Sequence, residues 1–435
     1  MTAISFDAAL ASAGTGAYQR RLLLIFGLVW AADAMQVLAI GFTAPSIAKT
    51  FGLTVPQALQ TGTAFFLGML VGAFLFGRLA DRYGRRRVLI GTVLIDAVFG
   101  ILSAFAPDFW WLVGLRFLTG LGVGGTLPVD YAMMAEFLPA SRRGRWLVIL
   151  EGFWAVGTVA VALTAWLAAG SEAPWRTIFL VTGLPALIGI FLRLWIPESP
   201  MYLLRTGRVQ EARAVLEKIA RDNGRALPRG EIAAWLQPSA PASALFSAEL
   251  RRRSVLILAV WFLVSASYYG VFVWLPAQLA GQGFGFLRGE FFLVLVALAQ
   301  IPGYALAAYG VEQWGRRPTL IGFLLLSAAG CFLYAVAVSA TLVAASTLAM
   351  SFALLGTWGS LYAYTPEIYP TNLRATGMGA AGSIARLGGL LAPSVMAPVM
   401  AAGFGYALAG FSGLLVVAAL AVAAIGVETR NAPLT

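Results

Sequence analysis

One arginine stands in the middle of a long apolar stretch near the C-terminus. Arg386 lies within residues 375–401, where a buried cation costs about 2.5–3.5 kcal/mol and needs an anion, a water-filled cavity or a ligand. A guanidinium can form two parallel hydrogen bonds with a carboxylate. Arg386 could therefore hold the carboxylate of an organic anion. The alternative is a permanent ion pair with an acid from the first half of the chain, since its own stretch has no acid nearby.

Three further charged residues could move protons. Asp33 lies about 18 Å into the first apolar stretch at 1.5 Å per residue, and Arg116 lies in the outer half of the fourth. A nearby cation stabilises a carboxylate, so the pair could release a proton on approach and take one up on separation. A fixed salt bridge is the alternative. Glu151, in the inner part of the fifth stretch, is a second candidate, and Asp96 and Asp130 are weaker ones.

Two aromatic side chains in the tenth apolar stretch could contact a ligand. Trp358 and Tyr362 are four residues apart and share one face of a helix. A flat heteroaromatic acid could stack on such rings. Packing or anchoring at the membrane interface is the alternative, and most aromatic residues in membrane proteins have that role.

The elements that position these residues are predicted to cross a membrane. The chain has 435 residues, of which 60% are hydrophobic and 11% charged, whereas soluble domains carry about 25% charged residues. The net charge of +11 sits in short clusters between apolar stretches, which is typical of loops facing anionic headgroups rather than of nucleic-acid binding. The chain has no His, so proton chemistry falls to carboxylates. The only cysteine, Cys331, excludes an intramolecular disulfide, and no signal peptide is expected.

Apolar runs of about 20 residues indicate twelve transmembrane helices in an all-α protein. The predicted spans are 21–48, 58–80, 87–105, 109–134, 145–169, 174–195, 254–280, 287–311, 318–337, 341–364, 375–401 and 404–427. The predicted domains are an N-terminal tail (1–20), a six-helix bundle (21–196), a linker with short helices (197–253), a second six-helix bundle (254–427) and a C-terminal tail (428–435).

The distribution of basic residues predicts the orientation. Of the 30 Lys and Arg residues, 24 fall in the tails, the linker and the loops of one side. Only Lys49, Arg176 and Arg288 fall on the other side. Because cytoplasmic loops are enriched in basic residues, we expect both termini in the cytoplasm.

Glycines mark predicted helix crossings, because they let backbones approach in lipid. They lie in the fourth span (Gly120, Gly122, Gly124 and Gly125) and the eleventh (Gly377, Gly379, Gly382, Gly388 and Gly389).

Two motifs recur at a single offset, which indicates an internal duplication. Residues 77–87 form a basic loop, and Asp81 with its Gly and two Arg recurs from Glu312, an offset of 231 residues (312 − 81). Glu136-x-x-Pro139-x-x-x-Arg143 recurs from Glu367 to Arg374, and 367 − 136 is again 231. Two mirrored halves around a midplane site are typical of secondary transporters.

These motifs resemble signatures of the major facilitator superfamily. The loop Gly77-x-x-x-Asp81-Arg82-x-Gly84-Arg85-Arg86 resembles its loop signature, and Arg116-x-x-x-Gly120, Pro197-Glu198-Ser199-Pro200 and residues 366–371 are similar to its sugar-porter-like branch. Residues 32–38, 150–154, 300–304 and 358–367 look like the bacterial niacin permeases, and residues 268–270 and 386–388 are similar to organic-anion carriers. Gln36 stands at a position where relatives often carry an acid. This difference bears on the identity of the coupling ion and not on the fold.

The resemblance implies a site and a substrate. It implies that Trp154, Tyr268, Tyr269 and Gln300 face one cavity with Arg386, Trp358 and Tyr362. Arg386 would bind the carboxylate of nicotinate or a similar small aromatic acid, the rings would enclose the substrate, and Gln300 could bind a ring nitrogen or water. Asp33, Arg116 and Glu151 would couple transport to protons.

Charged residues of the basic loops are interpreted as a cytoplasmic gate that joins the two halves when the cavity opens outward. They are Asp81, Arg82, Arg85, Glu136, Arg143, Glu312, Arg316, Glu367 and Arg374. Control of topology by positive charge alone is the alternative.

The sequence contains no nucleotide-binding loop, metal-ligand cluster or catalytic triad. We therefore expect no cofactor, no metal and no enzymatic activity. The expected protein is a monomeric, proton-coupled importer of a nicotinate-like anion in the bacterial inner membrane, with no nucleic-acid partner. A sugar carrier, an organic-cation carrier and a transporter-like nutrient sensor are the alternatives.

Overall fold

The computed structural model describes residues 4–228, 230, 232, 241–281, 289–370 and 373–430. Within them, β-structure is confined to one isolated bridge between Ile4 and Ile232. The helices are α1 (Phe6–Ala13), α2 (Ala17–Phe51), α3 (Val55–Ala58), α4 (Gln60–Tyr83), α5 (Arg85–Ser103), α6 (Phe109–Glu136), α7 (Ala140–Ala168), α8 (Pro174–Arg193), α9 (Pro200–Arg205), α10 (Val209–Asp222), η1 (Ala242–Phe246), α11 (Arg251–Gly281), α12 (Glu290–Leu298), α13 (Gln300–Gln313), α14 (Arg316–Ala335), α15 (Ala340–Tyr364), η3 (Thr365–Ile368), α16 (Arg374–Ala402) and α17 (Phe404–Ile425).

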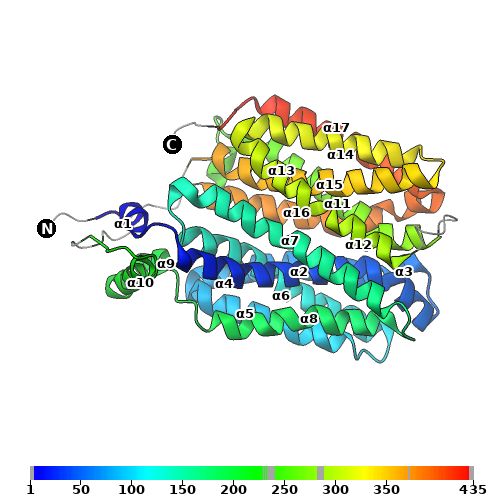
Figure 1. Ribbon diagram of the computed structural model, residues 1–435, viewed down its shortest axis with the longest axis horizontal. Helices are drawn as coiled ribbons and strands as arrows, with labels where there is room; N and C mark the ends of the chain where they lie inside the picture. The colour runs from blue at the N-terminus through cyan, green and yellow to red at the C-terminus, as the bar shows by residue number, and fades with distance from the viewer. Residues whose placement is uncertain are drawn as a thin grey trace.

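The long helices run side by side in two groups, one formed by α2 and α4–α8 and the other by α11–α17 (Figure 1). The groups meet where α4 packs on α16, α7 on α12 and α2 on α11. In the described part of the chain, nine segments are long and apolar enough to cross a membrane. The further long helices α5, α8 and α16 pack against α6, α2 and α11. The predicted all-α membrane fold is confirmed.

One predicted span is divided into two helices. The span expected at 287–311, whose first two residues lie outside the described ranges, forms α12 and α13 with a turn at Ala299. Pro302 explains the turn, because proline has no N–H to donate to the carbonyl of Leu298 and its ring crowds that carbonyl. The turn places Gln300 at the start of α13.

Glycines bring α4 and α6 into backbone contact. A Cβ added at Gly68 or Gly72 of α4 would lie 2.1 Å from a carbonyl oxygen of α6. Reciprocally, a Cβ at Gly120 or Gly124 of α6 would lie 2.0 or 2.1 Å from a carbonyl oxygen of α4. Each helix thus carries two glycines four residues apart, a spacing that lets membrane helices approach closely.

We expect Gly124→Ala to destabilise the protein strongly. The new methyl group would collide with the carbonyl of Met69, and a backbone carbonyl cannot rotate away as a side chain can. Overpacking typically costs about 1–3 kcal/mol, and we expect the upper end of this range as a lower Tm in detergent. Gly114→Ala on the same helix is the matched control, because no atom lies within 4 Å of its added Cβ. Equal Tm values for the two variants would contradict the assigned contact.

Charged helix ends gather at one end of the bundle. Arg85, Arg143, Arg316 and Arg374 lie there, at the starts of α5, α7, α14 and α16, and we call it the basic end. The short helices α1, α9 and α10 lie beyond it, on the left in Figure 1. The predicted helical stretch of the linker forms α10.

Candidate functional site

A central cavity with an empty volume of about 550 Å³ lies between the two helix groups. Its lining comes from α2, α4, α6 and α7 of the first group and from α11, α13, α15 and α16 of the second. The lining residues are Trp30, Phe66, Met69, Leu127, Glu151, Trp154, Tyr268, Tyr269, Tyr304, Trp358, Tyr362, Gly382, Ala385 and Arg386. The cavity therefore has aromatic walls, one cation and one acid.

Arg386 presents a buried guanidinium to this cavity. Its Nη1 donates a hydrogen bond to the Gly382 carbonyl oxygen at 2.8 Å, and its Nε has no hydrogen-bond partner in the described protein. None of the ion pairs formed between described side chains includes Arg386. Asp33 of α2 lies close enough to attract it electrostatically. The guanidinium therefore retains hydrogen-bonding capacity for an anionic ligand.

The aromatic walls form a continuous series of edge-to-face contacts. Tyr268 contacts the ring of Tyr269 at 5.1 Å and that of Trp358 at 6.0 Å between centroids. Behind the lining, Trp261 packs on Trp358 at 5.4 Å and on Tyr362 at 4.8 Å. Such contacts hold the rings in fixed orientations.

A hydrogen bond joins the two halves beside the cavity. Trp154 Nε1 on α7 donates to the Tyr268 hydroxyl on α11 at 2.8 Å. Both side chains are buried. Relative movement of the two halves must therefore break or rearrange this bond.

Glu151 is the acid of the central cavity. It is 3% exposed, and its Oε1 has no hydrogen-bond partner in the described protein. Its electrostatic neighbours are the phenols of Tyr131, Tyr269, Tyr304 and Tyr362. A proton on this carboxyl would lower the cost of burying it.

Arg116 binds Gln36 of α2, which lies one turn beyond Asp33. Its Nη1 donates to Gln36 Oε1 at 2.7 Å and its Nη2 to the Gln36 carbonyl oxygen at 2.8 Å. The rings of Phe65 and Phe179 flank the guanidinium at 4.6 Å each. Asp96 attracts it electrostatically. In this conformation Arg116 is thus held by an uncharged side chain.

Gln300 does not line the central cavity. It lines a second cavity with an empty volume of about 300 Å³, together with Leu38, Phe42, Thr158, Phe272, Leu275, Pro276, Leu293, Val296 and Ala297. Of the seven predicted substrate-binding residues, the other six line the central cavity. The prediction that Gln300 faces this cavity is wrong. Gln300 lies at the start of α13, one turn before Tyr304, and Tyr304 is the residue of α13 that lines the central cavity.

A family profile described as Major Facilitator Superfamily matches residues 22–393. The chain belongs to this superfamily. It is 36% identical to a niacin transporter of Acinetobacter baylyi over 96% of this chain and 95% of that protein. It is 35% identical to a Bacillus subtilis protein provisionally named for niacin or nicotinamide transport, over 96% of this chain and 98% of that protein.

Solved structures of other proteins share the fold of this chain. The inward-open, partially occluded xylose transporter of E. coli aligns over 96% of this chain and all of its own, with a TM-score of 0.77 and 22% identity. The chain is therefore a membrane transporter with the major facilitator fold rather than an enzyme.

The loop signature of the superfamily forms a charge cluster at the basic end of the first half. Arg85 pairs with Glu136 at 2.8 Å, and Ser199 also hydrogen-bonds to Glu136. Glu198 accepts hydrogen bonds from the backbone N–H groups of Arg85 and Arg86 at 3.1 and 3.2 Å. An acid at this position stabilises the unsatisfied N–H groups at the start of α5.

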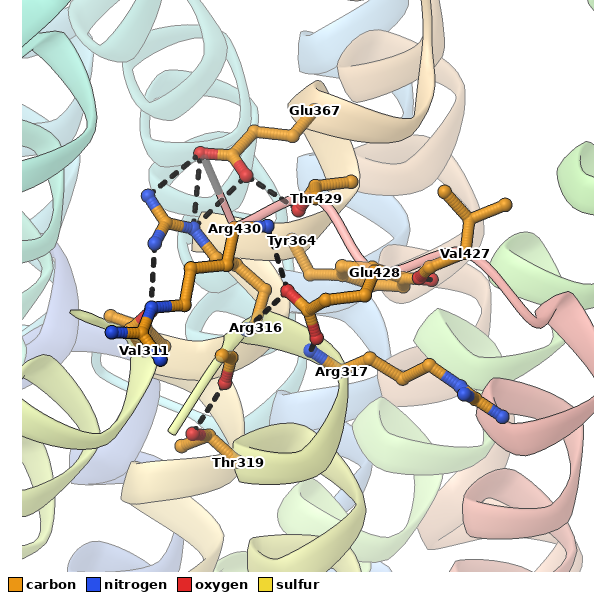
Figure 2. A network of polar contacts seen from close by, with 11 residues as sticks. Val311, Arg316, Arg317, Thr319, Tyr364, Glu367, Val427, Glu428, Thr429 and Arg430 are labelled. Carbon is orange, nitrogen blue, oxygen red and sulfur yellow. Dashed lines mark hydrogen bonds and ion pairs between the residues drawn. The ribbon is translucent and has the colours of Figure 1, made fainter. Parts of the chain in front are cut away.

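The second half of the chain repeats this cluster (Figure 2). Arg316 pairs with Glu367 at 3.0 Å, and Thr429 Oγ1 donates to Glu367 at 2.6 Å. Glu428 accepts from the N–H groups of Arg316 and Arg317 at 2.9 and 3.0 Å. The turns before the two clusters carry Gly84 and Gly315 with φ of +101° and +110°, a conformation that favours glycine.

Glu428 and Thr429 were not among the predicted functional residues, although the sequence contained a signal for them. Glu428-Thr429 repeats Glu198-Ser199 at an offset of 230 residues (428 − 198). The lining residues Trp30, Phe66, Met69 and Tyr304 were also not predicted. The same residue types fill the packed core, so residue type alone could not identify these four as cavity residues.

The predicted gate residues lie within each half in this conformation. Among the described side chains, no ion pair joins the two halves at the basic end. Arg143 and Arg374 donate to carbonyl oxygens five residues before them, at 3.2 Å each. Arg82 and Glu312 are exposed, and the side chain of Asp81 lies outside the described part. In this conformation two charge clusters thus brace their own halves, and the latch between the halves in an outward-open state stays a prediction.

We expect Glu367→Gln to lower Tm by several degrees. The substitution keeps the shape but removes the charge that Arg316 binds inside a largely buried cluster, and hydrogen bonds to charged groups are worth about 1.5–3 kcal/mol. Glu211→Gln is the matched control, because Glu211 binds Arg208 at 2.6 Å on the exposed surface of α10, where ion pairs contribute little. An equal change in Tm in the two variants would show that burial of the cluster does not add to its stabilising effect.

Proposed function

We propose that this transporter imports nicotinate or a closely related small aromatic carboxylate, coupled to protons, across the bacterial inner membrane. The observation that carries the proposal is a buried guanidinium with an unpartnered Nε beside a cavity walled by aromatic rings. The similarity to a niacin transporter over nearly the whole chain supports the substrate.

Arg386 fixes the carboxylate through two parallel hydrogen bonds, and the ring of the substrate stacks among Tyr268, Tyr269 and Trp358. Trp154 and Tyr362 complete the enclosure. Binding the anion neutralises a buried charge that has no ion-pair partner among the described side chains, so the substrate itself stabilises the occupied state.

Protons enter the cycle through the acids near the cavity. Glu151 lines the cavity together with Arg386, and Asp33 interacts electrostatically with Arg386. Arg116 positions α2 through Gln36. Protonation changes the charge balance around the site and biases the exchange between inward-facing and outward-facing states.

The basic end faces the cytoplasm in this proposal, because cytoplasmic loops carry the excess of Arg and Lys. Both tails are then inside the cell, and the two charge clusters stabilise the two rocking halves. The transporter works as a monomer by alternating access.

Uptake of labelled nicotinate into proteoliposomes, with and without a pH gradient, tests the proposal. We expect uptake above that of empty liposomes, accumulation when the outside is acidic, and competition by unlabelled benzoate. Competition by xylose or by a quaternary ammonium ion instead of benzoate would favour a sugar or cation carrier. No uptake by folded protein would overturn the proposed substrate.

A further inference from the structure

We propose that Asp96 of α5 is a positioning residue that controls which helix Arg116 holds. A protonated Asp96 leaves Arg116 bound to Gln36 of α2, and an ionised Asp96 draws the guanidinium towards α5. We call these three residues the Arg116 switch. All three are fully buried, and none is among the described residues that line the central cavity. The Arg116 switch therefore lies outside the binding site, within the first half.

The packing of α5 brings Asp96 close to the contact between Gln36 and Arg116. A Cβ added at Gly100 of α5 would lie 2.2 Å from Nε2 of Gln36, so the Gln36 amide is pressed against that helix. Asp96 lies four residues before Gly100, on the same face of α5. A Cβ added at Gly122 of α6 would lie 2.5 Å from the backbone nitrogen of Asp96. Asp96 thus lies where α5 meets α6, one turn along α5 from the Gln36 amide.

The unused hydrogen-bonding groups of the Arg116 switch are complementary. Neither carboxyl oxygen of Asp96 has a hydrogen-bond partner in the described protein, and the same is true of Arg116 Nε and Gln36 Nε2. An ionised carboxylate supplies acceptors, whereas the two nitrogens are donors. A carboxylate can bind Nε and one Nη group of an arginine together. Because both Nη groups now bind Gln36, such a pair would take one of them away from α2.

The charge of Asp96 decides between the two arrangements. A proton on Asp96 lowers the cost of burying a carboxyl group that no described donor contacts, which fits the arrangement in this structure. Loss of this proton leaves a buried anion, and its cost is offset only by a cation that bonds to it with good geometry. Arg116 is such a cation, since the two groups already attract each other electrostatically. Ionised Asp96 therefore competes with Gln36 for Arg116.

Arg116 is the cation that the neighbouring helices bring to the depth of Asp96. The charged residues of α4 and α8, which also pack on α5, lie in the first turn or the last two turns of those helices. On α6, Asp130 and Glu136 lie two or more turns beyond the level of Asp96, towards the basic end. On α2, Asp33 lies one turn from Gln36. Asp33 is thus the acid whose titration a test must separate from that of Asp96.

Movement of Arg116 towards Asp96 loosens the hold of α6 on α2. Helix α2 carries Trp30, which lines the central cavity and contacts the ring of Tyr131 on α6 at 6.1 Å between centroids. A shift of α2 therefore changes this ring contact and the wall of the binding site. A proton outside the cavity can in this way bias the exchange between inward-facing and outward-facing states. The inference rests on the proposed function only in taking protons as the driver of transport.

Fluorine NMR of the full-length protein labelled with fluorotryptophan tests the Arg116 switch without any substrate. Trp30 reports the position of α2 against α6, and the variant Trp30→Phe assigns its resonance. We expect this resonance to shift between acidic and alkaline pH in the wild type. The shift should be lost in Asp96→Asn, because the amide mimics the protonated acid at every pH. The resonance of Trp110, an exposed residue at the start of α6, is the internal control and should not move.

Two further variants complete the experiment. Asp108→Asn is the matched control, because Asp108 is an exposed acid that accepts a hydrogen bond from the Trp111 N–H at 2.9 Å at the start of α6. It should keep the wild-type shift of the Trp30 resonance. Gln36→Met removes the side-chain acceptor of Arg116, so the Trp30 resonance at acidic pH should move towards its alkaline position.

Separate outcomes distinguish the Arg116 switch from the proposed function. A Trp30 resonance that is independent of pH in the folded wild type would overturn the Arg116 switch. An equal shift in Asp96→Asn would also overturn it and assign the shift to another acid, such as Asp33. If Asp96→Asn does not fold, a spectrum unchanged in Gln36→Met has the same meaning. Failure of nicotinate uptake together with a shift that depends on Asp96 would overturn the proposed substrate and leave the Arg116 switch standing.

Discussion

Arg386→Ala is expected to abolish measurable uptake of nicotinate at low concentration. Truncating one partner of a buried, hydrogen-bonded charge pair costs about 2–5 kcal/mol, which corresponds to a loss of affinity between about 30-fold and 4,000-fold. Arg386→Lys should fall between alanine and wild type, because lysine keeps the charge but loses the planar fork that matches a carboxylate. Binding of labelled nicotinate to purified protein measures both effects directly.

The control for this prediction is Ser383→Ala on the same helix. Ser383 is half-buried, and its hydroxyl donates a hydrogen bond to the Gly379 carbonyl oxygen of its own helix at 2.9 Å. The Ser383→Ala variant should bind nicotinate with the affinity of the wild type. Unchanged nicotinate affinity in Arg386→Ala would show that the guanidinium serves packing and that the anion binds elsewhere.

Glu151→Gln is expected to uncouple transport from the pH gradient. The amide mimics the protonated carboxyl permanently, so the variant should still exchange nicotinate across the membrane but no longer concentrate it. With one proton per substrate, a gradient of one pH unit can drive about tenfold accumulation in the wild type. The variant should reach an inside-to-outside ratio of about one instead. Parallel assays of accumulation and of counterflow in proteoliposomes separate the two activities.

Asp33→Asn tests the second acid in the same assay, and Glu249→Gln serves as the control because Glu249 is an exposed acid of the linker. Full accumulation by Glu151→Gln would remove Glu151 from the coupling mechanism. Loss of counterflow as well as accumulation would show that its carboxylate is needed for binding rather than for coupling.

The sequence predicted features that depend on residue type and period. Apolar length anticipated the long helices of the described chain, nine of which are apolar enough to cross a membrane. The 231-residue offset anticipated two matching clusters built around Glu136 and Glu367. A charged side chain in a membrane span, such as Arg386, is a candidate functional position almost by itself because its burial is so costly. Helical spacing indicated Trp358 and Tyr362, and the resemblance supplied Trp154, Tyr268 and Tyr269.

The remaining features depend on how helices are rotated and shifted against one another. Arg116 could meet either Asp33 or Gln36, which lie one turn apart on α2, and only the packing of α2 against α6 selects Gln36. Gln300 and Tyr304 share a face of α13 but differ in depth, so they line different cavities. The sequence of a single helix does not reveal how that helix is rotated, or how far it is shifted, against its neighbours.

The contacts of Glu428 and Thr429 have a consequence for how each half is held together. These residues follow α17, cover the start of α14 and bind Glu367. Glu198 and Ser199 follow α8, cover the start of α5 and bind Glu136 in the same way. Each half is therefore fastened by the segment that leaves its own last long helix, so the two fastenings can be loosened one at a time by substitutions far apart in the sequence.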